Sequence, residues 1–177
     1  MPNSQKPWAV EQLSMLMGRL DRSPLRVKSL NVWLEPPKAG WMNLAIAANG
    51  QKAVIRTSDV FDPYSDIVMW LKSVTTAKQP SIMQIDEEGD TKILVVLQTR
   101  EEDVRFLVAD YDYGESFEDA PEYPGVYIDV EIDRTRFLED FCTPLYRALS
   151  RGCLREGRQG RAKIDMGDLR QYFIQYH

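Results

Sequence analysis

The sequence has little of several residues on which enzymes and secreted proteins depend. Its 177 residues include one histidine and two cysteines. The histidine is His177, the last residue, and chain ends rarely hold a catalytic geometry. A serine or cysteine nucleophile therefore has no histidine base to activate it. Cys142 and Cys153 have no histidine near them, so the sequence indicates neither a zinc site nor a disulfide scaffold, and we expect reduced thiols.

Long apolar runs and nucleotide-binding glycine motifs are also missing. No stretch approaches the roughly 18 apolar residues that span a bilayer. Residues 1–6 are polar, and no apolar segment of a signal peptide follows them. The sequence contains no Walker-type loop and no GxGxxG entry into a helix. These absences favour a cytoplasmic protein with no membrane partner and no cofactor.

The remaining composition is that of an ordinary globular protein. Hydrophobic residues make up 44% and charged residues 28% of the chain. A chain of this length buries enough surface to form its own core without disulfides or a metal. We therefore predict one α+β domain over residues 1–177.

Local patterns predict helices that are separated by runs of consecutive strands. Helices are expected at 8–22, 63–77 and 134–150, with a last short helix that Asp165 could cap, and strands at 27–34, 41–48, 51–57, 82–85, 93–97, 105–111 and 126–133. Pro144 should kink or split the third helix. This order favours an antiparallel sheet of about six or seven strands with helices packed against it.

Two turns and two apolar runs carry the most local information. Asn49-Gly50 suits the type I′ turn of a hairpin, and Gly89 suits a left-handed position in the turn at 87–90. The apolar runs at 93–97 and 106–109 should lie in the middle of the sheet. Several aromatic residues in or beside apolar patterns are expected in the core, namely Trp33, Trp41, Trp70, Tyr111 and Tyr127.

Charge is distributed unevenly along the chain. Residues 1–80 carry 10 basic and 6 acidic residues, residues 81–140 carry 5 and 18, and residues 141–177 carry 7 and 3. The central segment therefore has a net charge of −13 within a chain whose net charge is −5. Such a segment attracts cationic partners and repels phosphates, so a nucleic acid is an unlikely partner.

We interpret the acidic segment as a surface that binds a basic protein. The candidate partner-binding residues are Asp86, Glu87, Glu88, Asp90, Asp110, Asp112, Tyr113 and Glu115. Tyrosine among carboxylates can form a contact surface because it buries a large area at low entropic cost. In the competing interpretation these carboxylates are solvated turn and strand residues, neutralised by the arginine-rich stretch at 152–163.

Two further functions remain open at this stage. Clustered carboxylates such as Asp86 with Asp110 or Asp112 could act as acid and base, or bind a divalent cation, in a histidine-free hydrolase. The ligand spacing in the segment 86–90 does not match that of an EF-hand. Alternatively, the basic C-terminal region of one copy could bind the acidic centre of another, which would make the protein a homo-oligomeric structural protein.

The segment Ser58-Asp59-Val60-Phe61-Asp62-Pro63 leading to Trp70-Leu71, and the segment Ile85-Asp86-Glu87-Glu88-Gly89, resemble a pattern in small uncharacterised bacterial proteins. Some of those proteins are encoded near toxin-immunity genes. The resemblance covers about a third of the chain and concerns a helix cap and a hairpin turn. It implies an α+β fold, a bacterial source and an immunity-like role, and it assigns no catalytic residue.

Overall fold

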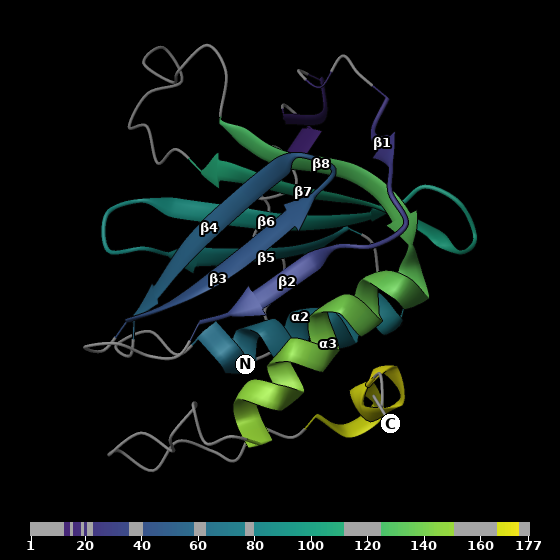
Figure 1. Ribbon diagram of the computed structural model, residues 1–177. Coiled ribbons are helices and arrows are strands. Elements are labelled where there is room, and N and C mark those ends of the chain that lie inside the picture. The colour runs from purple at the N-terminus through teal and green to yellow at the C-terminus, as the bar shows by residue number, and fades with distance from the viewer. Residues whose placement is uncertain are drawn as a thin grey trace.

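The structure, a computed structural model, describes residues 13, 14, 16–18, 20, 23–35, 41–58, 63–76, 80–111, 125–150 and 166–173 (Figure 1). Its elements are β1 (Leu25–Arg26), β2 (Asn31–Leu34), β3 (Trp41–Ala48), β4 (Gln51–Ser58), α2 (Pro63–Thr75), β5 (Ser81–Asp86), β6 (Thr91–Gln98), β7 (Asp103–Tyr111), β8 (Val126–Asp133), α3 (Arg134–Ser150) and the 3₁₀ helix η1 (Gly167–Tyr172). Of the helix predicted at 8–22, the described residues 13, 14 and 16–18 are helical.

The described strands form two sheets, which confirms the α+β class but corrects the prediction of one antiparallel sheet. One sheet has five strands in the order β1-β8-β7-β6-β5, and the other has three in the order β2-β3-β4. The first is mixed, because β1 pairs with β8 in parallel. In Figure 1 the three-stranded sheet lies in front of the five-stranded sheet, with α2 and α3 below both.

The strand predicted at 27–34 is present only over residues 31–34, and a two-residue strand that was not predicted precedes it. Leu25 and Arg26 form β1 beside β8, whereas residues 31–34 form β2 beside β3. Between them Leu30 donates its backbone N–H to the buried Asp140 Oδ2 at 2.6 Å. This short connection carries the chain from one sheet to the other, and alternation alone could not indicate the break because both pieces are extended.

The predicted hairpins and the second helix are confirmed. Asn49 and Gly50 have φ angles of 46° and 82°, as a type I′ turn requires, and β3 pairs with β4 over its whole length. Helix α2 begins at Pro63, as predicted, and ends at Thr75, two residues before the predicted end. A proline is favoured at a first helical position because its fixed φ suits the helix and its missing N–H is not needed there.

The main core lies between the two sheets and against the helices. Its centre is a group of aromatic rings, in which Phe137 lies 5.2 Å from Phe106, 4.8 Å from Phe141 and 5.7 Å from Trp70 between ring centroids. These residues come from β7, α2 and α3, and each is at most 4% exposed. The cluster therefore joins the five-stranded sheet to both helices.

The other face of the five-stranded sheet packs against the N-terminal helical residues. Leu94 and Val96 belong to the main core, whereas Ile93 and Val95 form a second cluster with Leu13 and its helical neighbours. Adjacent strand residues point to opposite faces, so β6 is buried on both sides. The prediction that the apolar runs of β6 and β7 lie mid-sheet is confirmed.

Of the three tryptophans predicted to lie in the core, one is buried. Trp70 is buried, and its indole N–H donates to the backbone oxygen of Ser81 at 3.2 Å. Trp41 is half-buried, and Trp33 is 49% exposed. The prediction for Trp33 was wrong because Val32 and Leu34, on the opposite face of β2, are the residues that pack against the core.

Helix α3 runs unbroken through Pro144, so this proline does not split it. Asp133, the last residue of β8, caps the helix, since its Oδ1 accepts the backbone N–H of Arg136 at 2.8 Å. The last short helix is η1, whose N-cap position is Met166. The predicted cap, Asp165, lies outside the described residues.

A side chain connects the edges of the two sheets. Gln51 of β4 accepts the backbone N–H of Asp129 in β8 at 2.7 Å, and its amide nitrogen lies 3.5 Å from the backbone oxygen of the same residue. The Gln51 amide therefore occupies the position that a neighbouring strand would take. None of the described helices is long and apolar enough to cross a membrane.

Candidate functional site

The predicted site centres on the turn between β5 and β6. The backbone N–H of Glu87 donates to the backbone oxygen of Asp90 at 2.7 Å, and Asp86 Oδ1 accepts the backbone N–H of Glu88 at 2.8 Å. Glu88 and Gly89 have φ angles of 61° and 131°, so the positive φ values extend to a glutamate as well as the expected glycine. Asp86, Glu88 and Asp90 are exposed at this end of the sheet.

Beside this turn, Lys92 brings two of the predicted carboxylates together. Its Nζ lies 2.6 Å from Asp110 Oδ1 and 3.0 Å from Glu87 Oε2. Lys92 and Asp110 are partners in the pairing of β6 with β7, so the strand register creates one of these ion pairs. The side chains of Lys92 and Glu87 are only 12% and 9% exposed, whereas that of Asp110 is 37% exposed.

Tyr127 completes this group, which we call the Lys92 cluster: Glu87, Lys92, Asp110 and Tyr127. The Tyr127 hydroxyl donates to Asp110 Oδ2 at 2.9 Å, and Lys92 Nζ lies 5.3 Å from the centre of its ring. The pairing of β7 with β8 has a register shift that leaves Tyr127 without a Cα partner. Such a bulge turns a side chain away from strict alternation, which accounts for its contact with Asp110.

Burial of Tyr127 was predicted, but its side chain is 38% exposed, so that prediction was wrong. The Tyr111 side chain lies outside the described residues. Gly125, two residues before Tyr127, lies so close to Asp110 that a Cβ added there would overlap Asp110 Oδ2. The backbone oxygen of Gly125 also accepts the N–H of Asp110 at 2.9 Å. A larger residue at this position would therefore have to displace the Asp110 carboxylate.

The electrostatics of the Lys92 cluster favour its charged form. Burial alone would lower the pKa of the Lys92 ammonium, but the hydrogen bonds and charges of Asp110 and Glu87 outweigh burial and raise it. The hydrogen bond to Asp110 and partial burial raise the pKa of Tyr127 as well. At neutral pH the lysine is therefore a cation and the tyrosine a neutral donor.

Glu87 also connects the two sheets. Its Oε1 accepts the backbone N–H of Arg56 in β4 at 2.6 Å, while its Oε2 faces Lys92. Both carboxylate oxygens are therefore bound within the molecule. Of the predicted residues, Glu87 and Asp110 come together around Lys92, and Asp86, Glu88 and Asp90 lie on the adjacent turn. Asp112, Tyr113 and Glu115 lie outside the described residues.

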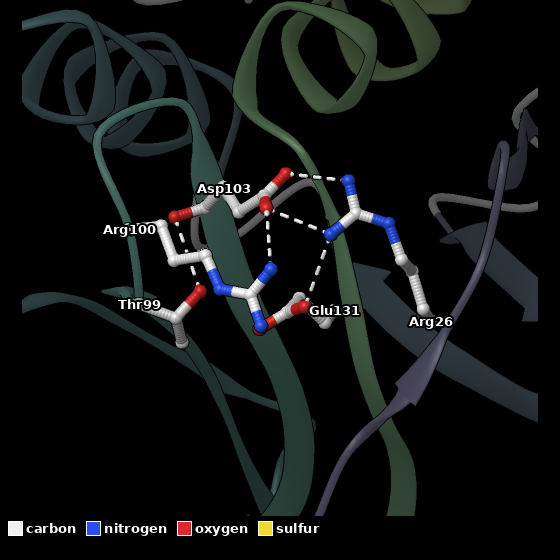
Figure 2. A network of polar contacts seen from close by, with 5 residues as sticks. All are labelled: Arg26, Thr99, Arg100, Asp103 and Glu131. Carbon is white, nitrogen blue, oxygen red and sulfur yellow. Dashed lines mark hydrogen bonds and ion pairs between the residues drawn. The ribbon is translucent and has the colours of Figure 1, made fainter.

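A second polar network, which the sequence analysis did not identify, joins β1 to the sheet (Figure 2). Arg26 forms two hydrogen bonds to Asp103, at 2.7 and 2.9 Å, and a third to Glu131 at 3.1 Å. The hydrogen bonds from Arg26 outweigh burial and lower the pKa of Asp103. Arg100 approaches the same carboxylate at 4.0 Å. Only the parallel pairing of β1 with β8 reveals this contact, and no local sequence signal indicates it.

The ion pairs limit the chemistry that the described carboxylates can perform. Arg105 binds Asp129 through Nε at 2.7 Å, and Arg136 binds Asp140 at 2.9 Å. Each of these two carboxylates already has an arginine as its partner, although burial raises the pKa of Asp140 above its ordinary value. The described residues contain no group of three or more potential metal ligands. Burial raises the pKa of the Cys142 thiol to about 12, so it is not an activated nucleophile.

Comparison of the chain with family models, with curated proteins and with solved structures gives no match.

Proposed function

We propose that the protein is a non-enzymatic binding module that docks a basic protein partner at the acidic end of its five-stranded sheet. The acidic end consists of the exposed residues Asp86, Glu88 and Asp90, together with Val126 and Tyr127. The observation that carries the proposal is the contrast in charge pairing. Lys92 forms ion pairs with the less exposed Glu87 and Asp110, whereas the three turn carboxylates have no cation beside them among the described residues.

The exposed apolar side chains at this end support the same function. Val126 and Tyr127 are 37% and 38% exposed, and the hydroxyl of Tyr127 is held by Asp110. A tyrosine held in one orientation loses little side-chain freedom when a partner covers it, so it is a suitable anchor. The turn carboxylates around it would increase the rate of encounter with a basic surface.

The other predicted residues are included in the proposed surface because of their position in the sequence. Asp112, Tyr113 and Glu115 directly follow β7, whose last residues pair with the beginning of β6 beside the acidic turn. An immunity-like role, as the resemblance to small bacterial proteins implies, is one form of this function. In that case the partner would be a basic toxin, and the acidic end would cover its cationic surface.

Charge reversal at the acidic end tests the proposal. The double variant Glu88→Lys and Asp90→Lys should lose a protein that the wild type captures from cells of the source organism. The matched control is Glu101→Lys with Glu102→Lys, because these exposed residues lie in the turn at the opposite end of β6 and make the same change in net charge. Capture is measured by quantitative mass spectrometry at low and high salt.

The expected result is at least a tenfold loss of one captured protein for the acidic-end variant and none for the control. The same protein should also be released by salt, since its contacts are exposed charges. Equal loss from both variants would show a general effect of net charge. Unchanged capture by the acidic-end variant, or no captured protein at all, would contradict the proposal.

A further inference from the structure

The outer face of the three-stranded sheet carries a row of apolar residues, and its strand β4 is joined to the Lys92 cluster by the hydrogen bond from the Arg56 backbone N–H to Glu87. The register places Trp33, Ala45 and Val54 side by side across β2, β3 and β4. Trp33 and Val54 are 49% and 43% exposed. Figure 1 shows no described helix in front of this sheet. A tryptophan exposed to this extent costs solvation energy unless another group covers it.

Two cations flank this row along β4. Lys52 and Arg56 lie two residues before and two residues after Val54, so all three point to the same face. Both are exposed, and neither has an ion-pair partner among the described residues. The Arg56 guanidinium instead lies 5.0 Å from the centre of the Trp41 ring. Along β4 the face therefore presents cation, apolar side chain and cation at intervals of about 7 Å. After β2 the same face carries the exposed Glu35, whose carboxylate accepts a hydrogen bond from Asn43 at 2.7 Å.

The size and charge of the face restrict its occupant. Three strands about 4.8 Å apart and at most eight residues long offer about 300 Å², whereas a stable dimer buries about 800 Å² on each partner. A single-stranded nucleic acid is less favoured, because such ligands stack successive bases on several aromatic rings. On this face Arg56 covers the Trp41 ring, so of these two rings Trp33 alone is open to a base.

We infer that this face docks a short extended acidic peptide segment of a partner protein. An extended chain places alternate side chains on one side at intervals of about 7 Å. An acidic residue, an apolar residue and a second acidic residue at alternate positions therefore match Lys52, Val54 and Arg56. The apolar side chain packs on Val54 and Trp33, and the two carboxylates bind the cations. The segment differs in charge from the partner at the acidic end and contacts a different surface.

A labelled peptide tests this inference with the full-length protein. The probe is a seven-residue fluorescent peptide with glutamate at its second and sixth positions, phenylalanine at the fourth and serine elsewhere. Binding is measured by fluorescence anisotropy at low salt. Saturable binding is expected for the wild type, and the double variant Lys52→Glu and Arg56→Glu should weaken it at least tenfold. Trp33→Ala should weaken it to a similar extent because the apolar contact is lost.

The control variant is Arg170→Glu, which changes an exposed arginine on η1, an element that packs on α2 and α3. It should leave binding unchanged, and circular dichroism checks that every variant is folded. Three results would overturn the inference: no saturable binding, equal binding of a probe with lysine in place of glutamate, or an equal loss with Arg170→Glu. Tighter binding of a single-stranded oligonucleotide that depends on Trp33 would also overturn it and assign the face to nucleic acid.

Discussion

Gly125 is the residue whose small size matters most for the Lys92 cluster. Its Cα lies against the Asp110 carboxylate, and that carboxylate is held on its other sides by Lys92 and Tyr127. The carboxylate therefore cannot turn away from an added methyl group without losing an ion pair or a hydrogen bond. The sequence shows a glycine after Pro124 but gives no indication of this approach, because Asp110 is distant along the chain.

We expect Gly125→Ala to destabilise the protein by about 1–3 kcal/mol, the usual cost of inserting a methyl group into a packed site. Urea unfolding measures the free energy difference. The control is Gly18→Ala, because a Cβ at Gly18 meets no atom within 4 Å and Gly18 is helical. That change should be neutral or stabilising by up to about 1 kcal/mol. Equal stability of Gly125→Ala and the wild type would contradict the described packing.

At the scale of elements, β1 is a strand of two residues whose pairing with β8 depends on Arg26. Beyond its two paired residues, Val27 donates its backbone N–H to the backbone oxygen of Glu131 at 2.8 Å. So short a strand forms few backbone hydrogen bonds of its own. The two hydrogen bonds from Arg26 to Asp103 therefore make a large part of its attachment to the sheet.

We expect Arg26→Met to lower stability near neutral pH and to speed hydrogen exchange at the Val27 amide, because β1 separates from β8 more often. The pKa of Asp103 is lowered by Arg26, so this stabilisation is present above the ordinary aspartate pKa of about 3.9 and is lost as the pH falls through the lowered value. Unfolding at several pH values should therefore show the variant and wild type converging in acid. A constant difference down to pH 2 would contradict this account.

The elements differ in how far they could be predicted. The hairpin at Asn49-Gly50 and helix α2 depend on neighbouring residues, so their signals are local and both were predicted. The division into two sheets depends on which strands pair, and alternation in β2 and β8 is the same whichever partner they have. For the site, the sequence identified the turn carboxylates, whereas Lys92 at the centre of the cluster was missed because its role depends on the register with β7.

At the scale of the whole molecule, one core connects both sheets and both long helices. Phe137 of α3 contacts the rings of Phe106 and Trp70, and the same buried cluster includes Leu44 and Ile55 of the three-stranded sheet. Neither sheet can separate from the other without exposing this cluster to water. The cost of that exposure makes the two sheets depend on each other.

We therefore expect the protein to unfold in a single transition in which both sheets are lost together. Phe137→Ala should lower the free energy of unfolding by about 3–5 kcal/mol and keep the transition single. The measurement compares far-ultraviolet circular dichroism with tryptophan fluorescence across a urea series. Tyr146→Ala is a control, since Tyr146 is 46% exposed and should cost less. Two separate transitions would show that the sheets are independent units.

The contact between Gln51 and Asp129 has a consequence for encounters between copies of the protein. An open strand edge is a template on which another chain can add a strand, and such addition leads to aggregation. The Gln51 amide satisfies the backbone of β8 at Asp129, and β1 covers the next part of that edge. This stretch of β8 is thus closed to intermolecular strand pairing by a single side chain from the neighbouring sheet.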